Sequence, residues 1–482
     1  MRIAFISAEV VPFAKTGGLA DVAGALPKIL AEKGHEVIVV MPHYKQIDNE
    51  KYGVEKVTDA LPIQLKGYPI DMTVHVSCAI PNVKTYLIGS GGLFFRDGIY
   101  GHNDDEYRFT AFCLGVMELL PLIGFQPDIV HANDWHTALI PTLLATTRNS
   151  NPFYAKTSSV FTIHNLAYQG LFGEYVLDIA GLPHELFTSE CLEFFGNFNF
   201  LKAGILYGDK VTTVSETYAK EIMTEEYGEK LDGVLKTRKN DLLGIVNGID
   251  YDIWSPKTDK YIAKNFSTDD ITLKKENKRA LQERFGFKTD ENIPLFGLVS
   301  RLSWQKGIDI LIESLKGILA EKEIQTVFLG TGDENLKREL IKLARKYPQK
   351  VSVTFDFDDP LSHQIYAGSD FFFMPSKYEP CGLGQLISMS YGTLVIARAT
   401  GGLEDTVTNI DRENSIAGTG VKFTDMNSFA LANAIKRAMA IYENKEILDK
   451  SVKRAMTEDF SFNVSAEKYI ELYNDLVKNA TI

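Results

Sequence analysis

Short apolar runs alternate with amphipathic stretches along most of the chain. Residues 2–8 form the first run, and after a glycine-rich turn apolar residues recur at helical spacing from Ala20 to Leu30, with Gly34 as the expected cap. Residues 36–41 form the next apolar run. Short continuous runs predict buried strands, so the chain opens as the strand–helix–strand crossover that joins parallel strands.

The alternation continues in two series separated by residues 255–277, a lysine-rich stretch that predicts a surface linker with at most one short helix. The first series predicts small strands at 72–80 and 84–88, a helix at 105–120, and further elements at 128–132, 137–147, 158–163, 199–207, 210–214, 216–226 and 243–246. The second predicts elements at 294–300, 306–320, 324–330, 335–346, 351–355, 362–367, 370–374, 384–391, 393–397, 427–442, 446–457 and 463–478.

Two such series predict an α/β protein with two doubly wound, Rossmann-like domains. In open sheets of this kind, ligands bind outside the carboxyl ends of the strands. Two domains that face each other would place the site in a deep interdomain cleft. Functional residues are therefore expected in strand-to-helix loops of both halves.

Composition narrows the function classes. The chain has 482 residues with 51 Lys+Arg and 63 Asp+Glu, a net charge of −12. A net acidic chain is a poor candidate for binding nucleic acid, which requires positive charge. The four cysteines are scattered without a CxxC pair, which excludes a disulfide scaffold and a clustered thiolate zinc site.

The apolar stretches do not predict targeting or membrane insertion. Residues 3–11 are short and interrupted by Glu9, unlike a signal peptide, and residues 113–125 contain Glu118 and Pro121 and are too short to cross a bilayer. We therefore expect a soluble cytoplasmic protein with no membrane partner.

A glycine turn directly after the first strand is the first candidate for chemistry. Lys15, Gly17 and Gly18 open the first helix, where unsatisfied N–H groups, the helix dipole and the lysine charge suit a phosphate. The alternative is an ordinary glycine turn with a surface lysine. It is not a P-loop, because GxxxxGK[ST] is absent.

Two loops of the second series are further candidates. Arg301 ends a strand and Lys306 begins a helix, so the pair could clamp a diphosphate, although a salt-bridged loop is the alternative. In residues 375–384, Glu379 could accept sugar hydroxyls and the following glycines could offer N–H groups; a helix N-terminal acid is the alternative. Cys381 has no visible general base, so we do not interpret it as a nucleophile.

Polar residues also end two strands of the first series. His164 and Asn165 follow one, and His131, Asp134, Trp135 and His136 lie at the end of another, a composition that suits sugar recognition. Metal binding by the histidines and Asp134 is the weaker interpretation, because the spacing matches no known ligand motif. Asp250-Tyr251-Asp252 and Asp356-Phe357-Asp358 are DxD tripeptides, and residues 330–333 are half of a dinucleotide fingerprint; both patterns are weak.

Together these stretches resemble the bacterial glycogen synthases and plant starch synthases, a family of retaining glucosyltransferases with the GT-B fold. The matching stretches run in family order over nearly the whole chain: KTGGLADVAGALP (15–27), DWH (134–136), FTIHNLAYQG (161–170), FLKAGILYGDKVTTVS (200–215), VNGID (246–250), SRLSWQKG (300–307), EPCGL (379–383) and YGTLVIARATGGLEDTV (391–407).

The resemblance implies a division of labour. Residues 1–248 would form the acceptor-side domain with catalytic loops, residues 459–482 a helix that packs back on it, and residues 249–458 the domain that binds the nucleotide sugar. The implied catalytic residues are His164, Arg301, Lys306 and Glu379. The implied donor-binding residues are Lys15, Gly17, Gly18, Asp21, Asn247, Phe357 (against the adenine), Cys381, Gly382, Leu383 and Gly384. The implied acceptor-binding residues are Tyr100, Asp134 and Trp135.

The family also implies the reaction, which is glucose transfer from ADP-glucose to the non-reducing end of an α-1,4-glucan, without metal or cofactor. UDP-glucose is the alternative donor. Two positions depart from the family: Gly384 stands where threonine is usual, and Ile387 stands where related retaining families carry a second acid. Two other readings stay open, another GT-B enzyme such as a sugar epimerase and a glucan- or nucleotide-binding protein with a decayed site.

Overall fold

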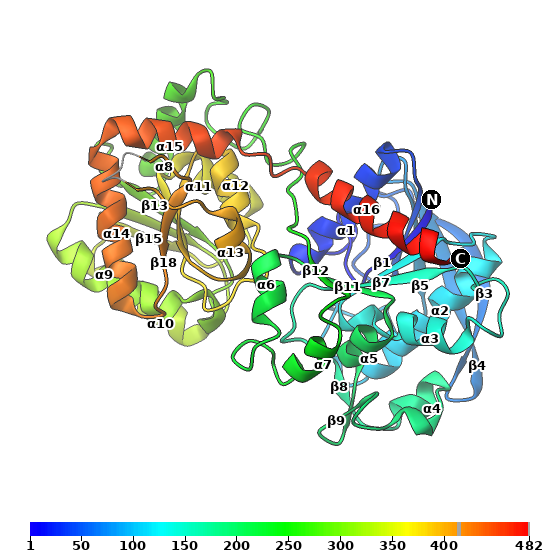
Figure 1. Cartoon of the computed structure of the whole chain (residues 1–482). Helices are drawn as coiled ribbons and strands as arrows, with labels where there is room; N and C mark the ends of the chain where they lie inside the picture. Colours follow the sequence, from blue (N-terminus) through cyan, green and yellow to red (C-terminus); the bar gives the residue numbers. More distant parts are fainter. Residues whose placement is uncertain (412–415, 481–482) are drawn as a thin grey trace. The chain divides into compact units, whose positions relative to one another are not determined.

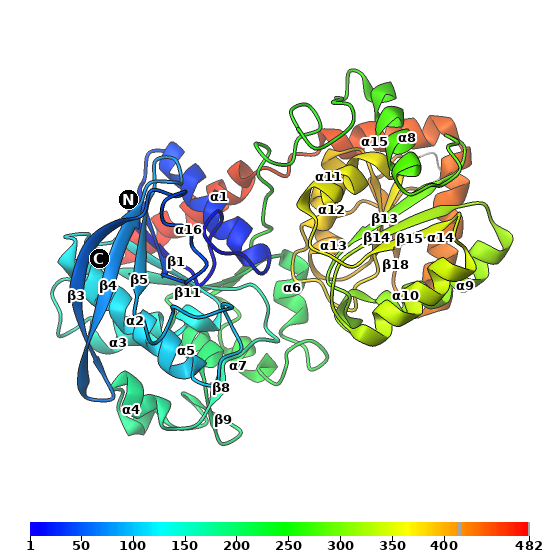
Figure 2. The ribbon, with the colours of Figure 1, turned by 180° about the vertical axis from the view of Figure 1, so that it is seen from behind.

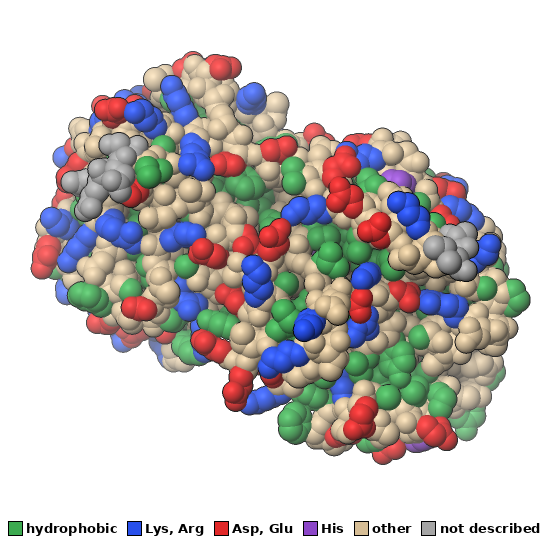
Figure 3. All heavy atoms as spheres, in the orientation of Figure 1, with side chains coloured by type: hydrophobic (Ala, Val, Ile, Leu, Met, Phe, Trp, Pro, Cys, Tyr) green, Lys and Arg blue, Asp and Glu red, His purple; other side chains and the backbone are tan. Residues whose placement is uncertain are grey.

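The computed structural model describes residues 1–411 and 416–480. The chain divides into two compact units: unit 1 comprises Met1–Asn247 and Phe462–Ile482, and unit 2 comprises Gly248–Ser461. Figures 1 and 2 show both units from opposite sides. On the face shown in Figure 3, Lys and Arg side chains are interspersed with Asp and Glu side chains, so the acidic excess is not gathered there.

Unit 1 is built on a sheet whose described strands run in the order β12-β11-β7-β6-β1-β2-β5-β4-β3. The strands are β1 (Arg2–Ile6), β2 (Glu36–Pro42), β3 (Glu55–Leu65), β4 (Tyr68–Ser77), β5 (Lys84–Gly89), β6 (Ile129–Asn133), β7 (Ser158–Ile163), β11 (Lys210–Thr213) and β12 (Leu242–Gly244). A small sheet has the order β8-β10-β9, with β8 (Leu171–Phe172), β9 (Glu193–Phe194) and β10 (Asn197–Asn199). Strands β3, β4 and β5 pair antiparallel, and the remaining pairs of the large sheet are parallel.

Helices cover the unit 1 sheet, which explains why central strands such as β6 and β7 are buried along their whole length. The helices are α1 (Gly18–Glu32), α2 (Asp105–Leu122), α3 (Leu139–Thr147), α4 (Val176–Ala180), α5 (Phe200–Tyr207), α6 (Glu216–Glu221), α7 (Asp232–Thr237) and α16 (Phe462–Ala480), with 3-10 turns η1 (Trp135–Thr137) and η2 (His184–Leu186).

The last helix of the chain, α16, belongs to unit 1 and runs beside α1 (Figure 1). Lys33 pairs with Glu467 at 2.5 Å, and the Tyr473 hydroxyl lies 2.6 Å from His131 Nδ1 in the core. Burial lowers the pKa of His131 to about 3, so this imidazole is neutral. The C-terminal helix is therefore joined to the sheet by a buried polar contact as well as by apolar packing.

Unit 2 carries a parallel sheet with the order β15-β14-β13-β16-β17-β18, the doubly wound Rossmann arrangement. Its strands are β13 (Leu295–Val299), β14 (Gln325–Leu329), β15 (Val351–Thr354), β16 (Phe371–Met374), β17 (Leu394–Arg398) and β18 (Gly420–Phe423). Its helices are α8 (Lys274–Arg284), α9 (Ile308–Glu321), α10 (Glu334–Lys346), α11 (Asp359–Gly368), α12 (Gly384–Ser390), α13 (Gly401–Thr406), α14 (Ser428–Glu443) and α15 (Lys445–Thr457), with turns η3 (Ile271–Leu273) and η4 (Trp304–Lys306). The prediction of two α/β domains with mainly parallel sheets is confirmed.

The prediction that residues 255–277 form a surface linker is wrong, because part of this stretch is buried in unit 2. Phe266 is buried, and so is Asp259, whose Oδ2 lies 2.6 Å from His363 Nδ1 and also accepts from the Tyr391 hydroxyl. The helix α8 begins inside the stretch. Polar residues there are held by partners far along the chain, a pattern that a lysine-rich sequence does not reveal.

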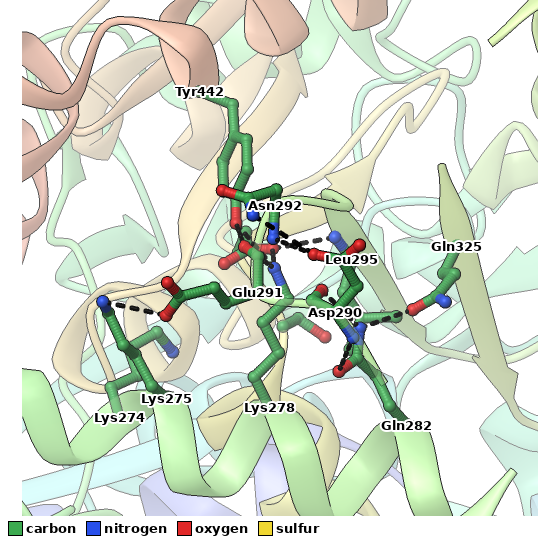
Figure 4. Close-up of polar contacts among 12 residues, drawn as sticks. Lys274, Lys275, Lys278, Gln282, Asp290, Glu291, Asn292, Leu295, Gln325 and Tyr442 are labelled. Atoms are coloured by element: carbon green, nitrogen blue, oxygen red, sulfur yellow. Dashed lines mark hydrogen bonds and ion pairs between the residues drawn. The ribbon is translucent and has the colours of Figure 1, made fainter. Parts of the chain in front are cut away.

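A cluster of lysine side chains from α8 lies at the amino ends of β13 and β16 (Figure 4). Lys278 Nζ donates to Asp370 Oδ2 at 2.7 Å and to the Tyr442 hydroxyl at 2.6 Å. Lys274 Nζ donates to Thr393 Oγ1 at 2.8 Å, and burial lowers the pKa of Lys274 to about 7. The cluster ties α8 to the sheet at the edge opposite the strand ends that carry the candidate site residues.

Candidate active site

In both units several of the sequence-predicted residues follow the carboxyl ends of strands at the point where the strand order reverses. In unit 1 this point lies between β1 and β6, and in unit 2 between β13 and β16. Such switch points are where open α/β sheets bind ligands. Glycine loop 15–18 follows β1, and Asp134 follows β6. Arg301 follows β13, and Glu379 follows β16.

The glycine loop of unit 1 donates hydrogen bonds to the carboxylate of Glu9. Glu9 Oε2 accepts from the backbone N–H groups of Thr16 at 2.5 Å and Gly17 at 3.0 Å. Gly17 has extended backbone as the N-cap of α1, and a Cβ built on it meets nothing within 4 Å. Packing within the chain therefore does not require glycine here, and the position leaves room for an approaching molecule.

Lys15 and Asp21 form a pair beside this loop. Their charged atoms lie 2.7 Å apart, with side chains 40% and 22% exposed. Asp21 stands in the first turn of α1, and Gly18 is its first residue. The lysine charge predicted to meet a phosphate is thus accompanied by an adjacent carboxylate.

Asp134 occupies a strained backbone conformation. Its φ of 57° and ψ of 177° are rare for any residue other than glycine. The carboxylate accepts from the backbone N–H of His164 at 2.7 Å, and burial raises the pKa of Asp134 to about 7. Strain of this kind persists where surrounding structure fixes it, which is typical of functional sites.

The His164 imidazole is neutral, because burial lowers its pKa to about 3. Its Nε2 lies 2.9 Å from Asn133 Oδ1, and the Asn133 amide nitrogen donates to the Ile6 carbonyl. The amide orientation makes Oδ1 an acceptor, so we assign the His164 proton to Nε2 and a lone pair to Nδ1.

Aromatic side chains surround the end of β6. The Tyr100 ring stacks on His136 with centroids 4.4 Å apart, and its hydroxyl donates to Glu9 Oε1 at 2.7 Å. Trp135 is only 8% exposed and packs against His136 and Phe109 at 4.2 and 5.1 Å. Because so little of the Trp135 ring is exposed, this structure favours it as support for its neighbours rather than as a platform on which a sugar ring stacks. Asn247, which follows β12, is buried.

The centre of the unit 2 site is an ion pair. Lys306 Nζ lies 2.6 Å from Glu379 Oε2, with side chains 18% and 6% exposed. Ser376 Oγ donates to the same oxygen at 2.9 Å. Lys306 comes from the loop after β13 and Glu379 from the loop after β16, so the switch point of the sheet creates the pair.

The loops after β13 and β14 lie against each other at the carboxyl ends of the unit 2 strands. Arg301 is exposed, and Leu302 beside it pairs with Gly332 of the loop after β14. A Cβ on Gly330 or Gly332 would come within 1.8 or 2.2 Å of the carbonyl oxygens of Ser300 and Leu302. The partial dinucleotide fingerprint is therefore explained by close packing of two loops.

The loop that contains Glu379 is held by tight backbone packing. A Cβ on Gly401 would lie 2.0 Å from the Glu379 carbonyl oxygen, and one on Gly402 would lie 2.1 Å from that of Cys381. Gly382 has a positive φ of 75°, and Leu383 is the N-cap of α12. The chain thus turns sharply at the start of α12 and fixes the backbone of residues 381–384.

The two departures from the family have structural counterparts. A Cβ on Gly384 would lie 3.2 Å from Phe372 Cε1 and 3.3 Å from Met374 Sδ, so threonine here requires these side chains to shift by a few tenths of an ångström. Ile387 is buried in the apolar core of unit 2.

Three of the four aspartates of the DxD tripeptides accept backbone N–H groups in local structure. Asp250 and Asp356 accept backbone N–H groups within their own turns, and Asp358 caps α11. Among residues 1–411 and 416–480, no three His, Cys, Asp or Glu side chains gather as metal ligands would. Phe357 follows β15, and the residue is 83% exposed.

Sequence reasoning missed three residues that organise these sites. Glu9 accepts hydrogen bonds from the glycine loop. The Asn133 side chain lies within hydrogen-bond distance of His164, and the Ser376 hydroxyl donates to Glu379. The available signal was position, since each follows or ends a strand at the carboxyl edge of its sheet. In the sequence, Glu9 only interrupts an apolar run.

The chain is similar to glycogen and starch synthases over nearly its whole length. The starch synthase catalytic domain family matches residues 2–237, and the glycosyl transferases group 1 family matches residues 278–455. The glycogen synthase of Geotalea daltonii is 45% identical over 478 residues, 98% of each chain, and that of Thermotoga maritima is 44% identical over 480 residues, again 98% of each. The catalytic domain of starch synthase IV from Arabidopsis thaliana, bound to ADP and acarbose, superposes with a TM-score of 0.91 at 32% identity and 99% coverage of each chain. No helix in the described part of the chain has the length and apolar character needed to span a membrane.

Proposed function

This chain belongs to the glycogen and starch synthase family. We propose that it is an ADP-glucose-dependent α-1,4-glucan glucosyltransferase and that its residues carry out the reaction as follows. Glucose is transferred from ADP-glucose to the non-reducing 4-OH of the glucan with retention of configuration. The complex of the Arabidopsis relative with ADP and acarbose supports an ADP-bearing donor and a glucan acceptor for this chain.

The observation that carries the proposal is the Lys306–Glu379 pair, 2.6 Å apart and mostly buried at the switch point of unit 2. A fixed ammonium and a fixed carboxylate side by side suit a sugar phosphate, whose two halves require opposite partners. Lys306 and Arg301 stabilise the charge that develops on the departing diphosphate, and Glu379 accepts glucose hydroxyls. The backbone of residues 381–384 binds the donor, and the exposed Phe357 ring stacks on the adenine.

Unit 1 supplies the residues that orient the transferred glucose and the acceptor. His164 is neutral, so it acts as a hydrogen-bonding partner of the sugar and offers its backbone carbonyl to the developing cation at C1. Asp21 and Asn247 hold the glucose, and Lys15, Gly17 and Gly18 lie against the sugar side of the donor. Tyr100 and Asp134 contact the acceptor, with Trp135 behind them.

The bond changes balance without an enzyme nucleophile. The bond between C1 and the β-phosphate oxygen breaks, and the acceptor O4 attacks C1 from the same face through an oxocarbenium-like ion pair. The proton of the 4-OH passes to the departing phosphate. Fixed cations lower the barrier by stabilising charge on that phosphate.

The test is glucose transfer onto glycogen from ADP-glucose and, separately, from UDP-glucose, with EDTA present. We expect incorporation from ADP-glucose despite the chelator, and an α-1,4 linkage in the product. Faster incorporation from UDP-glucose would reverse the donor assignment. No incorporation from either donor by folded protein would contradict the proposal and favour an epimerase or a binding role.

A further inference from the structure

We propose that Glu9 is the positioning residue that joins the glycine loop to Tyr100 in unit 1. The proposed function gives Glu9 no part in the reaction, and the inference rests on that function for its kinetic consequences. Glu9 follows β1 at the carboxyl edge of the sheet, and its side chain is buried, with the residue 5% exposed.

The two carboxylate oxygens of Glu9 serve different elements. Oε2 accepts from the backbone N–H groups of Thr16 and Gly17, at 2.5 and 3.0 Å. Oε1 accepts from the Tyr100 hydroxyl at 2.7 Å. One carboxylate group therefore sets the distance between the start of α1 and Tyr100, which lies 91 residues after Glu9 in the chain.

The connection continues from Tyr100 to the end of β6. The Tyr100 ring stacks on His136 at 4.4 Å, and His136 is two residues from the strained Asp134. Burial lowers the pKa of His136 well below 6.5, so its ring is neutral and packs as an aromatic surface. Glu9 thus lies between the loop assigned to the donor and the side chains assigned to the acceptor.

The charge of Glu9 is what a neutral side chain cannot replace. Hydrogen bonds to an ionised acceptor are roughly twice as strong as neutral ones. A glutamine would keep the shape and one oxygen for the two N–H groups, and its amide would face the Tyr100 hydroxyl. The glycine loop would form the same hydrogen bonds, but these bonds would be weaker. The position of the loop relative to Tyr100 would therefore be less well defined.

The test compares Glu9→Gln with Tyr100→Phe, which removes only the hydroxyl arm. Tyr100→Phe is expected to raise KM for glycogen severalfold and to leave KM for ADP-glucose within twofold. Glu9→Gln is expected to raise both KM values and to lower kcat/KM for the donor by about tenfold. The double variant should bind glycogen no worse than Glu9→Gln alone, because the hydroxyl acts through the carboxylate.

Asp209→Asn is the matched control. Asp209 precedes β11 at the amino ends of the same sheet. Its Oδ2 accepts from the backbone N–H of Ser159 at 2.7 Å, from the Ser159 hydroxyl at 2.9 Å and from the Arg148 guanidinium at 2.7 Å. This variant should lower the melting temperature and leave both KM values unchanged. If Glu9→Gln behaves like Asp209→Asn, Glu9 is only structural and the proposal is overturned; additive effects of Glu9→Gln and Tyr100→Phe overturn it as well.

Hydrogen exchange separates this proposal from the proposed function. Glu9→Gln should speed exchange of the Thr16 and Gly17 amides by about tenfold, whatever the substrate is, since two charge-assisted bonds become neutral ones. Unchanged exchange contradicts the role of Glu9 even in an active enzyme. If Glu9→Gln does not fold, Tyr100→Phe decides alone, and an unaltered KM for glycogen refutes the proposal.

Discussion

Replacing Lys306 with methionine would remove a charge at nearly constant side-chain size. In the parent protein the ammonium lies 2.6 Å from Glu379 Oε2, and both side chains are mostly buried. The substitution has two consequences. The resting protein keeps Glu379 with the Ser376 hydroxyl at 2.9 Å, and the reacting complex loses a fixed cation at the departing diphosphate.

The two consequences have separable magnitudes. Removing one preorganised group that stabilises developing charge costs about 10²–10³ in kcat. Breaking a fully buried pair costs roughly 3–5 kcal/mol, and because this pair is partly exposed and Ser376 remains, we expect about 2 kcal/mol of unit 2 stability. At about 2–4 °C per kcal/mol for a domain of this size, the melting temperature should fall by about 4–8 °C.

The control is a second lysine–carboxylate pair in the same unit. Lys278 lies 2.7 Å from Asp370, with side chains 6% and 15% exposed, at the amino ends of the strands. Lys278→Met should lower the melting temperature at least as much as Lys306→Met, while kcat and the Kd for ADP stay within twofold of the parent.

The assays are kcat with saturating ADP-glucose and glycogen, the Kd for ADP by calorimetry, and thermal melting of each variant. The reasoning is refuted if folded Lys306→Met keeps kcat and the Kd for ADP within twofold of the parent. It is refuted equally if Lys278→Met lowers kcat as much, because the loss would then follow from destabilisation of unit 2 and not from the position of the charge.

Three further predictions follow from individual groups. Burial lowers the pKa of Lys274 from 10.5 to about 7, so the stability of the parent should rise with pH between these values. The stability of Lys274→Met relative to the parent, measured in melting curves, should therefore be greater at pH 6.5 than at pH 9.5. Burial raises the pKa of Asp134 to about 7, so the parent should lose stability as pH rises from about 4 through 7. The stability of Asp134→Asn relative to the parent should therefore grow over this range and then level off. A stability difference between the two proteins that does not change with pH would contradict this prediction. Phe357 is 83% exposed, so Phe357→Ala should leave the melting temperature unchanged and raise the Kd for ADP by about tenfold, whereas an unchanged Kd would exclude adenine stacking.

The sequence predicted best the parts of the fold whose physics is local. Central parallel strands such as β7 are buried on both faces and therefore appear as continuous apolar runs. Strand β3 is largely exposed and its pairing with β4 carries register shifts, so its apolar–polar alternation is interrupted. Helix α8 has few apolar residues and is buried through polar contacts such as Lys278 with Asp370, which depend on distant segments.

The candidate site was predictable to the extent that motifs follow strands. The loops after β1, β6, β13 and β16 could be identified from glycines and charges beside apolar runs, and the family resemblance supplied the roles. Glu9 could not be identified in this way, because a glutamate within an apolar stretch resembles an interruption. Its function depends on partners 7, 8 and 91 residues away that only the folded chain brings together.

The glycines of the two units show why a glycine motif alone does not locate a phosphate. Positions 330 and 332 require glycine, because a Cβ there would clash with backbone carbonyl oxygens. A Cβ on Gly17 would meet no atom within 4 Å. The Gly17 N–H nevertheless already donates to Glu9, as does that of Thr16, and the Lys15 ammonium lies 2.7 Å from Asp21. The positive character predicted at this helix start is thus largely balanced within unit 1. The cations that stabilise a departing diphosphate must then come mainly from unit 2, which is why Lys306 is the residue whose removal should cost most turnover for the least change in shape.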